Sequence, residues 1–138
     1  MLKKLDLDMS RVHFVGRLPY SEYLKLLQVS SAHIYLTYPF VLSWSILDAM
    51  SAGCTIIASN TSPVLEVIED NHNGLLVDFY DIDSIVEKVE YALNNQDKME
   101  QIRYNARGTI IEKYALRDLL PKHIKFVKDI AAQKKLTV

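Results

Sequence analysis

The stretch from Thr37 to Ala58, TYPFVLSWSILDAMSAGCTIIA, constrains the fold more than any other part of the chain. Pro39 interrupts the preceding strand because it has no backbone N–H for a ladder, and Ser43 is a residue type that caps helix starts. Gly53 ends the helix, because glycine enters the left-handed conformation without a steric penalty. Three apolar residues share one helical face: Ile46, Leu47 and Met50. The stretch therefore predicts a strand end, a loop, a short helix and a buried strand.

The start of this helix is a candidate phosphate site. The first N–H groups of a helix have no intrahelical partner and carry partial positive charge, which suits an anion. Asp48 lies one turn after Trp44, on the side away from the apolar face. A strand, a loop, an anion-binding helix start and a second buried strand form half of a nucleotide-binding α/β unit.

The rest of the chain alternates short apolar runs with helical patterns. We expect further strands at Val12–Val15, Ala32–Leu36 and Leu75–Val77. We expect helices over Ser21–Gln28, Pro63–Ile68, Ile82–Leu93, about Gln96–Tyr114, and from about Leu116 onward. The predicted fold is α/β, a Rossmann-like parallel sheet flanked by helices, with C-terminal helices.

Some details of the helices are predicted as well. Asp81 is expected to cap the helix after it, and Pro121 to start or kink the last helix. The buried stripe of the capped helix is expected at Ile82, Ile85, Val86, Val89 and Leu93.

Composition sets the broad class. The 138 residues carry a net charge of −1, so we expect no nucleic acid partner. Cys54 is the single cysteine, which excludes an internal disulfide and fits a reducing compartment, so we expect a cytoplasmic location. No apolar run approaches the roughly 18 residues of a membrane span. The four histidines lack metal-ligand spacing, so we predict no metal site and no cofactor.

Several segments resemble one enzyme family. Leu47–Ala58 resembles the LEAMAxGxPVIA signature of retaining, family 4 nucleotide-sugar glycosyltransferases with the GT-B fold. Arg11–Gly16 resembles their VxFxG strand, Ser31–Leu36 their ADxxxxPS strand, and Asn73–Asp78 their xxGxLV strand. The resemblance covers the chain from about Arg11 to its end, and several ordered motifs are more specific than one glycine pattern.

The resemblance implies that residues 1–138 are an incomplete GT-B C-terminal domain that binds the donor. The N-terminal acceptor domain and the first two strand–helix units, which carry an Arg and a Lys for the diphosphate, would be absent. Val12–Val15 would then lie beyond the missing strands. It would pair with another strand of this chain, pair with a second molecule, or leave an open edge, so we expect a homo-oligomer through open sheet edges or a rearranged sheet.

The resemblance also implies site residues. The donor diphosphate would lie on the helix start, at Val41, Leu42, Ser43 and Trp44. Asp48 would hold the ribose hydroxyls, since a carboxylate accepts two hydrogen bonds; the alternative is a solvated surface aspartate. The base would be flanked by Gly16, Arg17 and Leu18, with Arg17 alternatively a solvated surface residue.

The donor sugar position departs from the family. Phe40 replaces a glutamate that typically contacts the sugar, so Phe40 and Pro39 would line the donor sugar cleft, with Phe40 either stacking on a sugar or forming a wall. Glu66 resembles a recurrent family glutamate, or serves the dipole of its helix.

The resemblance implies transfer of a sugar from a UDP-, GDP- or ADP-sugar to a glycan or lipid-linked acceptor, in polysaccharide biosynthesis. The chain alone would be inactive. A basic tail, including Lys122, Lys125 and Lys128, is expected to be a solvated helix face, with peripheral membrane contact as the alternative. A non-catalytic Rossmann-like binding or assembly module remains the second hypothesis for the whole chain.

Overall fold

Three parallel strands form the sheet in the computed structural model, which describes residues 8–38 and 41–134. They are β1 (His33–Tyr35), β2 (Ile56–Ser59) and β3 (Leu75–Val77), and they lie in the order β1-β2-β3. Ile34 is in register with Ile57, and Ile57 with Leu75. The predicted α/β class and parallel sheet are confirmed.

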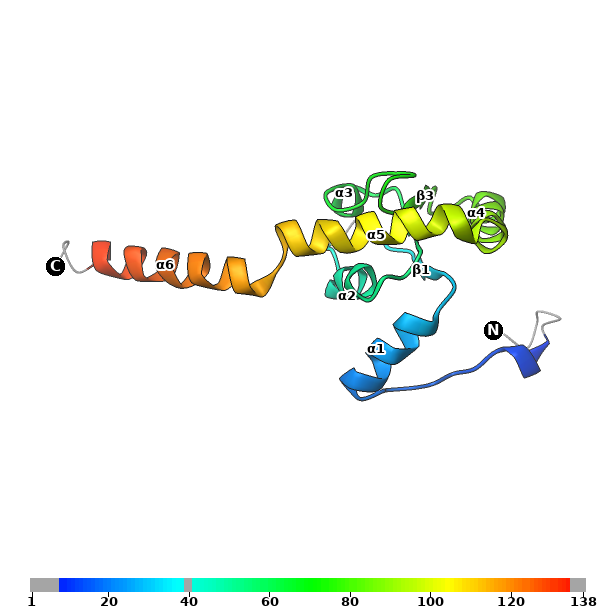
Figure 1. Ribbon diagram of the computed structural model, residues 1–138, viewed down its shortest axis with the longest axis horizontal. Helices are drawn as coiled ribbons and strands as arrows, with labels where there is room; N and C mark the ends of the chain where they lie inside the picture. The colour runs from blue at the N-terminus through cyan, green and yellow to red at the C-terminus, as the bar shows by residue number, and fades with distance from the viewer. Residues whose placement is uncertain (1–7, 39–40, 135–138) are drawn as a thin grey trace.

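Six α-helices surround or extend this sheet (Figure 1): α1 (Tyr20–Val29), α2 (Trp44–Ala52), α3 (Ser62–Leu65), α4 (Ile82–Asn94), α5 (Gln96–Lys113) and α6 (Leu116–Lys134). A short 3₁₀ turn, Met9–Arg11, precedes them. The predicted caps are confirmed. The Ser43 hydroxyl accepts the Ser45 N–H, Gly53 ends α2 with a φ of 81°, and the Asp81 carboxylate accepts the Ser84 N–H.

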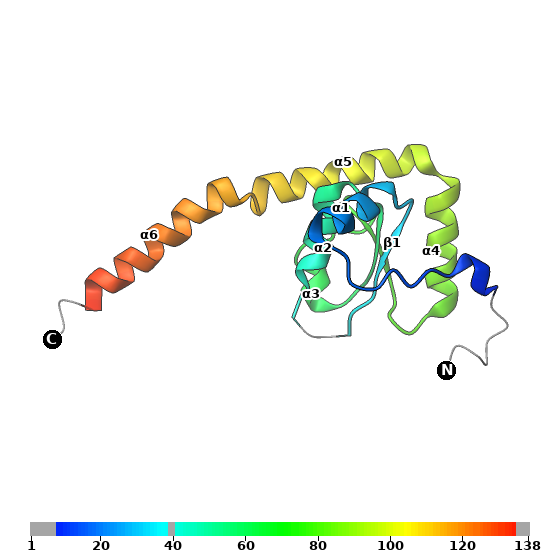
Figure 2. The same cartoon turned by 90° about the horizontal axis from the view of Figure 1, so that it is seen from below.

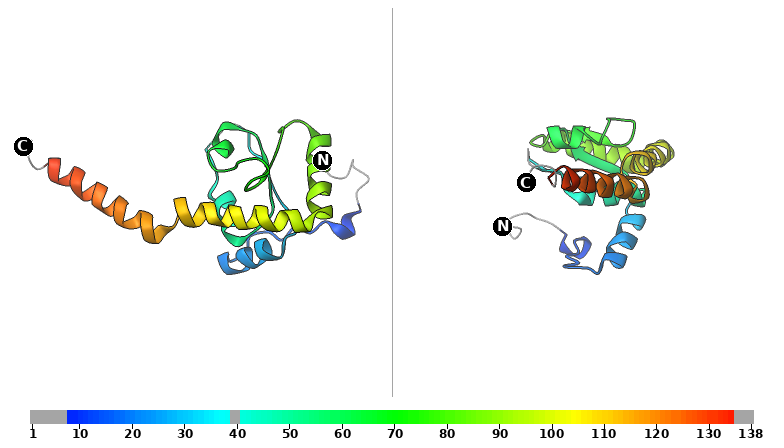
Figure 3. Two further views of the ribbon diagram at one scale, coloured as in Figure 1. Left: turned by 45° about the horizontal axis from the view of Figure 1, so that its top comes forward. Right: turned by 90° about the vertical axis from the view of Figure 1, so that its left-hand side faces the viewer.

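Each face of the sheet has its own core cluster. Alternate strand residues Tyr35, Ile56 and Ala58 pack with buried residues of α2, which are Ile46, Ala49 and Met50. On the opposite face, the buried set is Ile57, Leu75, Val77, Ala92, Met99 and Ile102. Helix α5 supplies Ala106 to the first cluster and Met99 to the second, so it joins the two across one end of the sheet (Figure 3). Burial of each large apolar side chain contributes about 1.5–3 kcal/mol before entropic costs.

The predicted strand at Val12–Val15 does not form. These residues are exposed coil, with Phe14 73% exposed. The segment runs apart from the sheet toward α1 in Figure 1, and it crosses in front of β1 in the view of Figure 2. Helix α1, which follows it, packs on α2. Among the described strands β1 has a partner on one side only, so the rearranged sheet is wrong and the open-edge alternative holds. Pairing with a second molecule stays a prediction.

The buried stripe of α4 differs from the predicted one. Ile85 and Val89 face the core together with Ala92, whereas Ile82 is 73% exposed and Val86 and Leu93 are also exposed. The short strands β2 and β3 offer α4 a narrow surface, which one row of residues at i, i+4 and i+7 covers.

One helix boundary differs. Helix α3 ends at Leu65 instead of Ile68, because the chain turns there and the Val67 and Ile68 side chains enter the core. Helix α6 begins at Leu116 as predicted, and Pro121 lies inside it rather than at its start.

Helix α6 leads away from the sheet and its helices, as all three ribbon figures show. Most of its large apolar residues are exposed: Leu116, Leu120, Ile124, Phe126, Val127 and Ile130. None of the helices that the structure describes combines the length and the apolar character needed to cross a lipid bilayer.

Candidate functional site

The start of α2 lies at the carboxyl end of β1, the edge of a parallel sheet where ligands collect. The loop before it is fixed from two sides. Leu42 packs partly against the core, and the Ser43 N–H donates to the hydroxyl of Tyr35 at 2.9 Å. Tyr35 belongs to β1 and is buried, so the strand itself holds the helix start in place.

The four residues predicted to bind the diphosphate differ in whether their backbone N–H groups are free and in their exposure to solvent. Ser43 already donates its N–H to Tyr35, while the N–H of Trp44, the first helical residue, has no acceptor within α2 by helix geometry. The side chains of Val41 and Trp44 are 75% and 82% exposed, so solvent reaches this helix start. The arrangement can accept an anion on its outer side.

Asp48 is half-buried and carries a partner that the sequence analysis did not identify as a site residue. The hydroxyl of Tyr20, the first residue of α1, donates to Asp48 Oδ1 at 3.1 Å. This hydrogen bond raises the pKa of Tyr20, because ionising the hydroxyl would remove the donor and place a negative charge beside the carboxylate. The two residues lie 28 positions apart, and no local pattern signals such a contact.

Tyr23 flanks the same carboxylate. Its ring centroid lies 6.1 Å from that of Tyr20, and burial raises the pKa of Tyr23, with the charge of Asp48 adding to the effect. Within residues 8–38 and 41–134 its buried hydroxyl has no hydrogen-bond partner. Two tyrosines of α1 thus lie near Asp48, one through a hydrogen bond and one through the effect of its charge.

The turn predicted to flank the base, residues 16–18, lies just before Tyr20 in the chain. Gly16 has a φ of +63°, a conformation that favours glycine, and Leu18 is half-buried two residues before Tyr20. Arg17 is exposed, and among the described residues it forms no ion pair. Helix α1 therefore connects the turn at residues 16–18 to Asp48.

Other predicted positions stand apart. Pro39 and Phe40 lie outside the described residues. Glu66 follows the last residue of α3, so it cannot serve the first-turn dipole of that helix, and its side chain is exposed. Cys54 is buried and its thiol donates to the Leu27 carbonyl at 2.8 Å; burial raises the pKa of this thiol.

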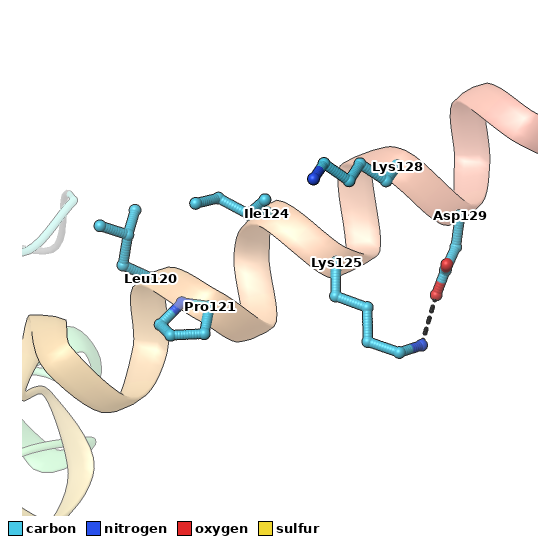
Figure 4. A pocket seen from close by; sticks show the side chains of 6 residues that line it. All are labelled: Leu120, Pro121, Ile124, Lys125, Lys128 and Asp129. Carbon is cyan, nitrogen blue, oxygen red and sulfur yellow. Dashed lines mark hydrogen bonds and ion pairs between the residues drawn. The ribbon is translucent and has the colours of Figure 1, made fainter.

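Neither a metal site nor, along α6, an enclosed ligand pocket is found in the part of the chain that the structure describes. Among the residues described, no three His, Cys, Asp or Glu side chains gather as metal ligands would. A shallow hollow lies along α6, but Figure 4 shows that all six of its lining residues belong to that single helix, from Leu120 to Asp129. One helix offers no enclosing wall, so this hollow is not a binding site.

The amino-acid sequence is similar to those of known glycosyltransferases. Residues 3–109 match the family model described as Glycosyl transferases group 1. A poly(ribitol-phosphate) alpha-N-acetylglucosaminyltransferase of Staphylococcus aureus is 30% identical over 79 residues, or 56% of this chain and 16% of the relative. An uncharacterized glycosyltransferase of Methanocaldococcus jannaschii is 26% identical over 104 residues, or 75% of this chain and 26% of the relative. The chain thus spans only a minor part of these relatives.

Solved structures show the same fold within larger chains. Sucrose-phosphate synthase from Thermosynechococcus elongatus superposes with a TM-score of 0.83 at 20% identity, covering 96% of this chain and 33% of that one. Anabaena HepE in complex with UDP-glucose gives a TM-score of 0.83 at 17% identity, covering 93% and 35%.

Proposed function

Because the chain belongs to the glycosyl transferases group 1 family, we propose that it is the donor-binding part of a larger sugar transferase. The observation that carries the proposal is the open start of α2 with Asp48 one turn inside the same helix. In this arrangement the Trp44 end of α2 receives the donor diphosphate, and the Asp48 carboxylate accepts hydrogen bonds from the ribose.

The proposed donor is a nucleotide diphosphosugar with UDP, GDP or ADP as its nucleotide. Support comes from Anabaena HepE, which shares this fold and was solved with UDP and with UDP-glucose. The base would lie against the turn at residues 16–18, which α1 connects to Asp48 through Tyr20.

The proposed reaction is a transfer that retains the anomeric configuration, with a glycan or lipid-linked acceptor and a role in polysaccharide biosynthesis. The principal contribution of this chain is to stabilise the negative charge that develops on the departing diphosphate. Basic residues and an acceptor domain elsewhere in the larger protein would complete the site, so this chain alone would not transfer sugar. We place the reaction in the cytoplasm, consistent with the buried free thiol of Cys54.

The contact between Tyr20 and Asp48 makes the proposal testable. Tyr20 occupies one acceptor oxygen of the carboxylate that the ribose would need. A ribose hydroxyl that donates to the same oxygen would compete with the Tyr20 hydroxyl. Removing that hydroxyl strengthens binding, because the competing hydrogen bond is worth about 0.5–1.5 kcal/mol.

The test is a calorimetric titration of the chain with UDP, GDP and ADP. We expect one nucleotide to bind, Asp48→Ala to weaken that binding, and Tyr20→Phe to strengthen it by about 2- to 10-fold. Asp97→Ala, at an exposed carboxylate of α5, is the matched control. If no diphosphate binds, the titration is repeated on the larger protein. Absence of binding there, or an equal effect of Asp97→Ala and Asp48→Ala, disproves the donor site and makes the non-catalytic assembly module the better hypothesis.

A further inference from the structure

Three aromatic rings meet at the carboxyl edge of the sheet, and one of them, Tyr38, directly precedes Pro39 and Phe40 in the chain. Tyr38 comes from the loop after β1, and Phe79 and Tyr80 come from the loop after β3. The ring centroid of Phe79 lies 5.8 Å from that of Tyr38 and 5.0 Å from that of Tyr80, and Tyr38 and Tyr80 are 6.1 Å apart. All three pairs are edge-to-face, the arrangement that aromatic quadrupoles favour. We call these three residues the aromatic cluster.

The backbone on the Tyr38 side is held by a buried residue of the central strand. Ser59, at the end of β2, donates its hydroxyl to the Thr37 carbonyl at 2.8 Å. It also accepts the Thr37 N–H at 3.0 Å, and Ser59 itself is fully buried. Both backbone groups of the residue before Tyr38 are therefore fixed to the sheet.

The backbone on the other side is held by Asp78. Its carboxylate accepts the Tyr80 N–H at 2.8 Å, and its carbonyl accepts the Asp81 N–H at 3.3 Å. Asp81 in turn caps α4. The loop that carries Phe79 and Tyr80 is thus closed between β3 and a helix start, so the aromatic cluster is positioned before any ligand arrives.

Two of the three rings of the cluster are open to solvent. Tyr38 is 60% exposed and Tyr80 is 73% exposed, while Phe79 between them is half-buried. Asp78 is exposed and accepts the Tyr80 N–H, so a carboxylate lies beside the rings. A surface that combines aromatic rings with carboxylate and phenol groups matches a ligand with an apolar face and a polar rim.

We propose that the aromatic cluster is a subsite for a neutral pyranose ring. The C–H face of the sugar stacks on the exposed ring of Tyr80, and Tyr38, whose ring is inclined at 68° to that of Tyr80, contacts the edge of the sugar. The hydroxyl groups of the sugar donate to Asp78. The negative charge of Asp78 disfavours anionic saccharides. The inference rests on the proposed function, since the ring comes either from the acceptor glycan or from the donor sugar.

The experiment records ¹H–¹⁵N NMR spectra of the whole chain during titration with maltotriose, triacetylchitotriose, UDP-glucose and UDP. Shifts at residues 38 and 78–81 with a free trisaccharide assign the subsite to an acceptor ring. Shifts there with UDP-glucose but not with UDP assign it to the donor sugar. If none of the saccharide probes shifts these residues, the proposal is overturned.

Variants separate stacking from general surface effects. We expect Tyr38→Ala and Tyr80→Ala each to weaken saccharide binding by about 3- to 10-fold, and Tyr80→Phe to keep it within about twofold, because the ring face remains. Tyr104→Ala removes an equally exposed tyrosine from α5 and is the matched control. An equal loss with Tyr104→Ala would refute the subsite. Trisaccharide binding does not use Asp48, so this result and the nucleotide titration fail independently.

Discussion

Helices α5 and α6 follow one another in the chain and have nearly equal lengths, 18 and 19 residues, yet their surroundings are opposite. Helix α5 packs along α2 and buries Met99, Ile102 and Ala106. Helix α6 leads away from the sheet and helices α1 to α5, which we call the body, and none of its residues through Ala132 is buried (Figure 1).

The amphipathic pattern is clearer in the exposed helix than in the buried one. Apolar residues recur along one side of α6 at helical spacing: Leu116, Leu120, Ile124 and Val127. Helix α5 is more polar, and it approaches α2 with the small side chain of Ala106. An apolar stripe therefore indicates that a helix can be buried, but burial itself depends on whether another element lies opposite.

The largest expected change in the free energy of unfolding comes from a matched pair of substitutions, one in α5 and one in α6. Ile102→Ala in α5 should lower the free energy of unfolding by about 2–4 kcal/mol, because it leaves a cavity in a packed cluster. Ile130→Ala in α6 should change it by less than about 0.5 kcal/mol, because that side chain is 46% exposed. Chemical denaturation measures both. Equal losses would show that α6 packs as tightly as α5 does.

Replacing two different glycines by alanine should change the free energy of unfolding in opposite directions. Gly53→Ala forces a side chain into a φ of +81° at the end of α2 and should cost about 1–2 kcal/mol. Gly108→Ala in α5 meets no atom within 4 Å and should stabilise the protein by about 0.5–1 kcal/mol through helix propensity. Denaturation curves of both variants provide the check. A loss of stability with Gly108→Ala would mean that α5 has no room on that side.

The pH dependence of stability should come from the body rather than from α6. Burial lowers the pKa of His33 below its ordinary value of 6.5. The unfolded chain therefore binds a proton first as the pH falls, so the free energy of unfolding should decrease between pH 7 and pH 5.

His33→Gln should reduce this slope, whereas His123→Gln, on the exposed surface of α6, should leave it unchanged. Urea denaturation at a series of pH values makes the comparison. A slope that follows His123 instead would show that the exposed helix is coupled to folding.

The smallest effect on global stability is expected for Pro121→Ala. Proline inside a helix removes one hydrogen bond and crowds the preceding turn, so the substitution should increase the helical signal in far-ultraviolet circular dichroism. The denaturation midpoint should stay the same, because α6 contributes no buried residue to the core. A shifted midpoint would contradict the separation of α6 from the body.

Much of the fold follows from local sequence signals. Ser43, Gly53 and Asp81 stand where the structure has its helix caps, and Leu75–Val77 forms β3 with the predicted bounds. Each of these features depends on the conformational preference of a few neighbouring residues, such as a hydroxyl at a helix start.

The candidate site can be predicted from local sequence signals only in part. The start of α2 was predictable because a helix terminus has unpaired N–H groups wherever it occurs. The hydrogen bonds that hold this site could not be predicted, because they join different elements. Tyr35 of β1 accepts the Ser43 N–H, and Tyr20 of α1 donates to Asp48 of α2. Ring clustering of Tyr38 with Phe79 likewise requires the loops after β1 and β3 to meet at one edge.

The sequence by itself determined the family, the parallel α/β order and the helix ends, because these depend on motifs and short-range preferences. Only the tertiary structure decided which edges and faces are used. Val12–Val15 has strand-forming residues but stays exposed coil, and α6 has an apolar stripe but stays exposed. In both cases the deciding quantity is whether a neighbouring element covers the segment, and hydrophobic burial requires two surfaces to meet.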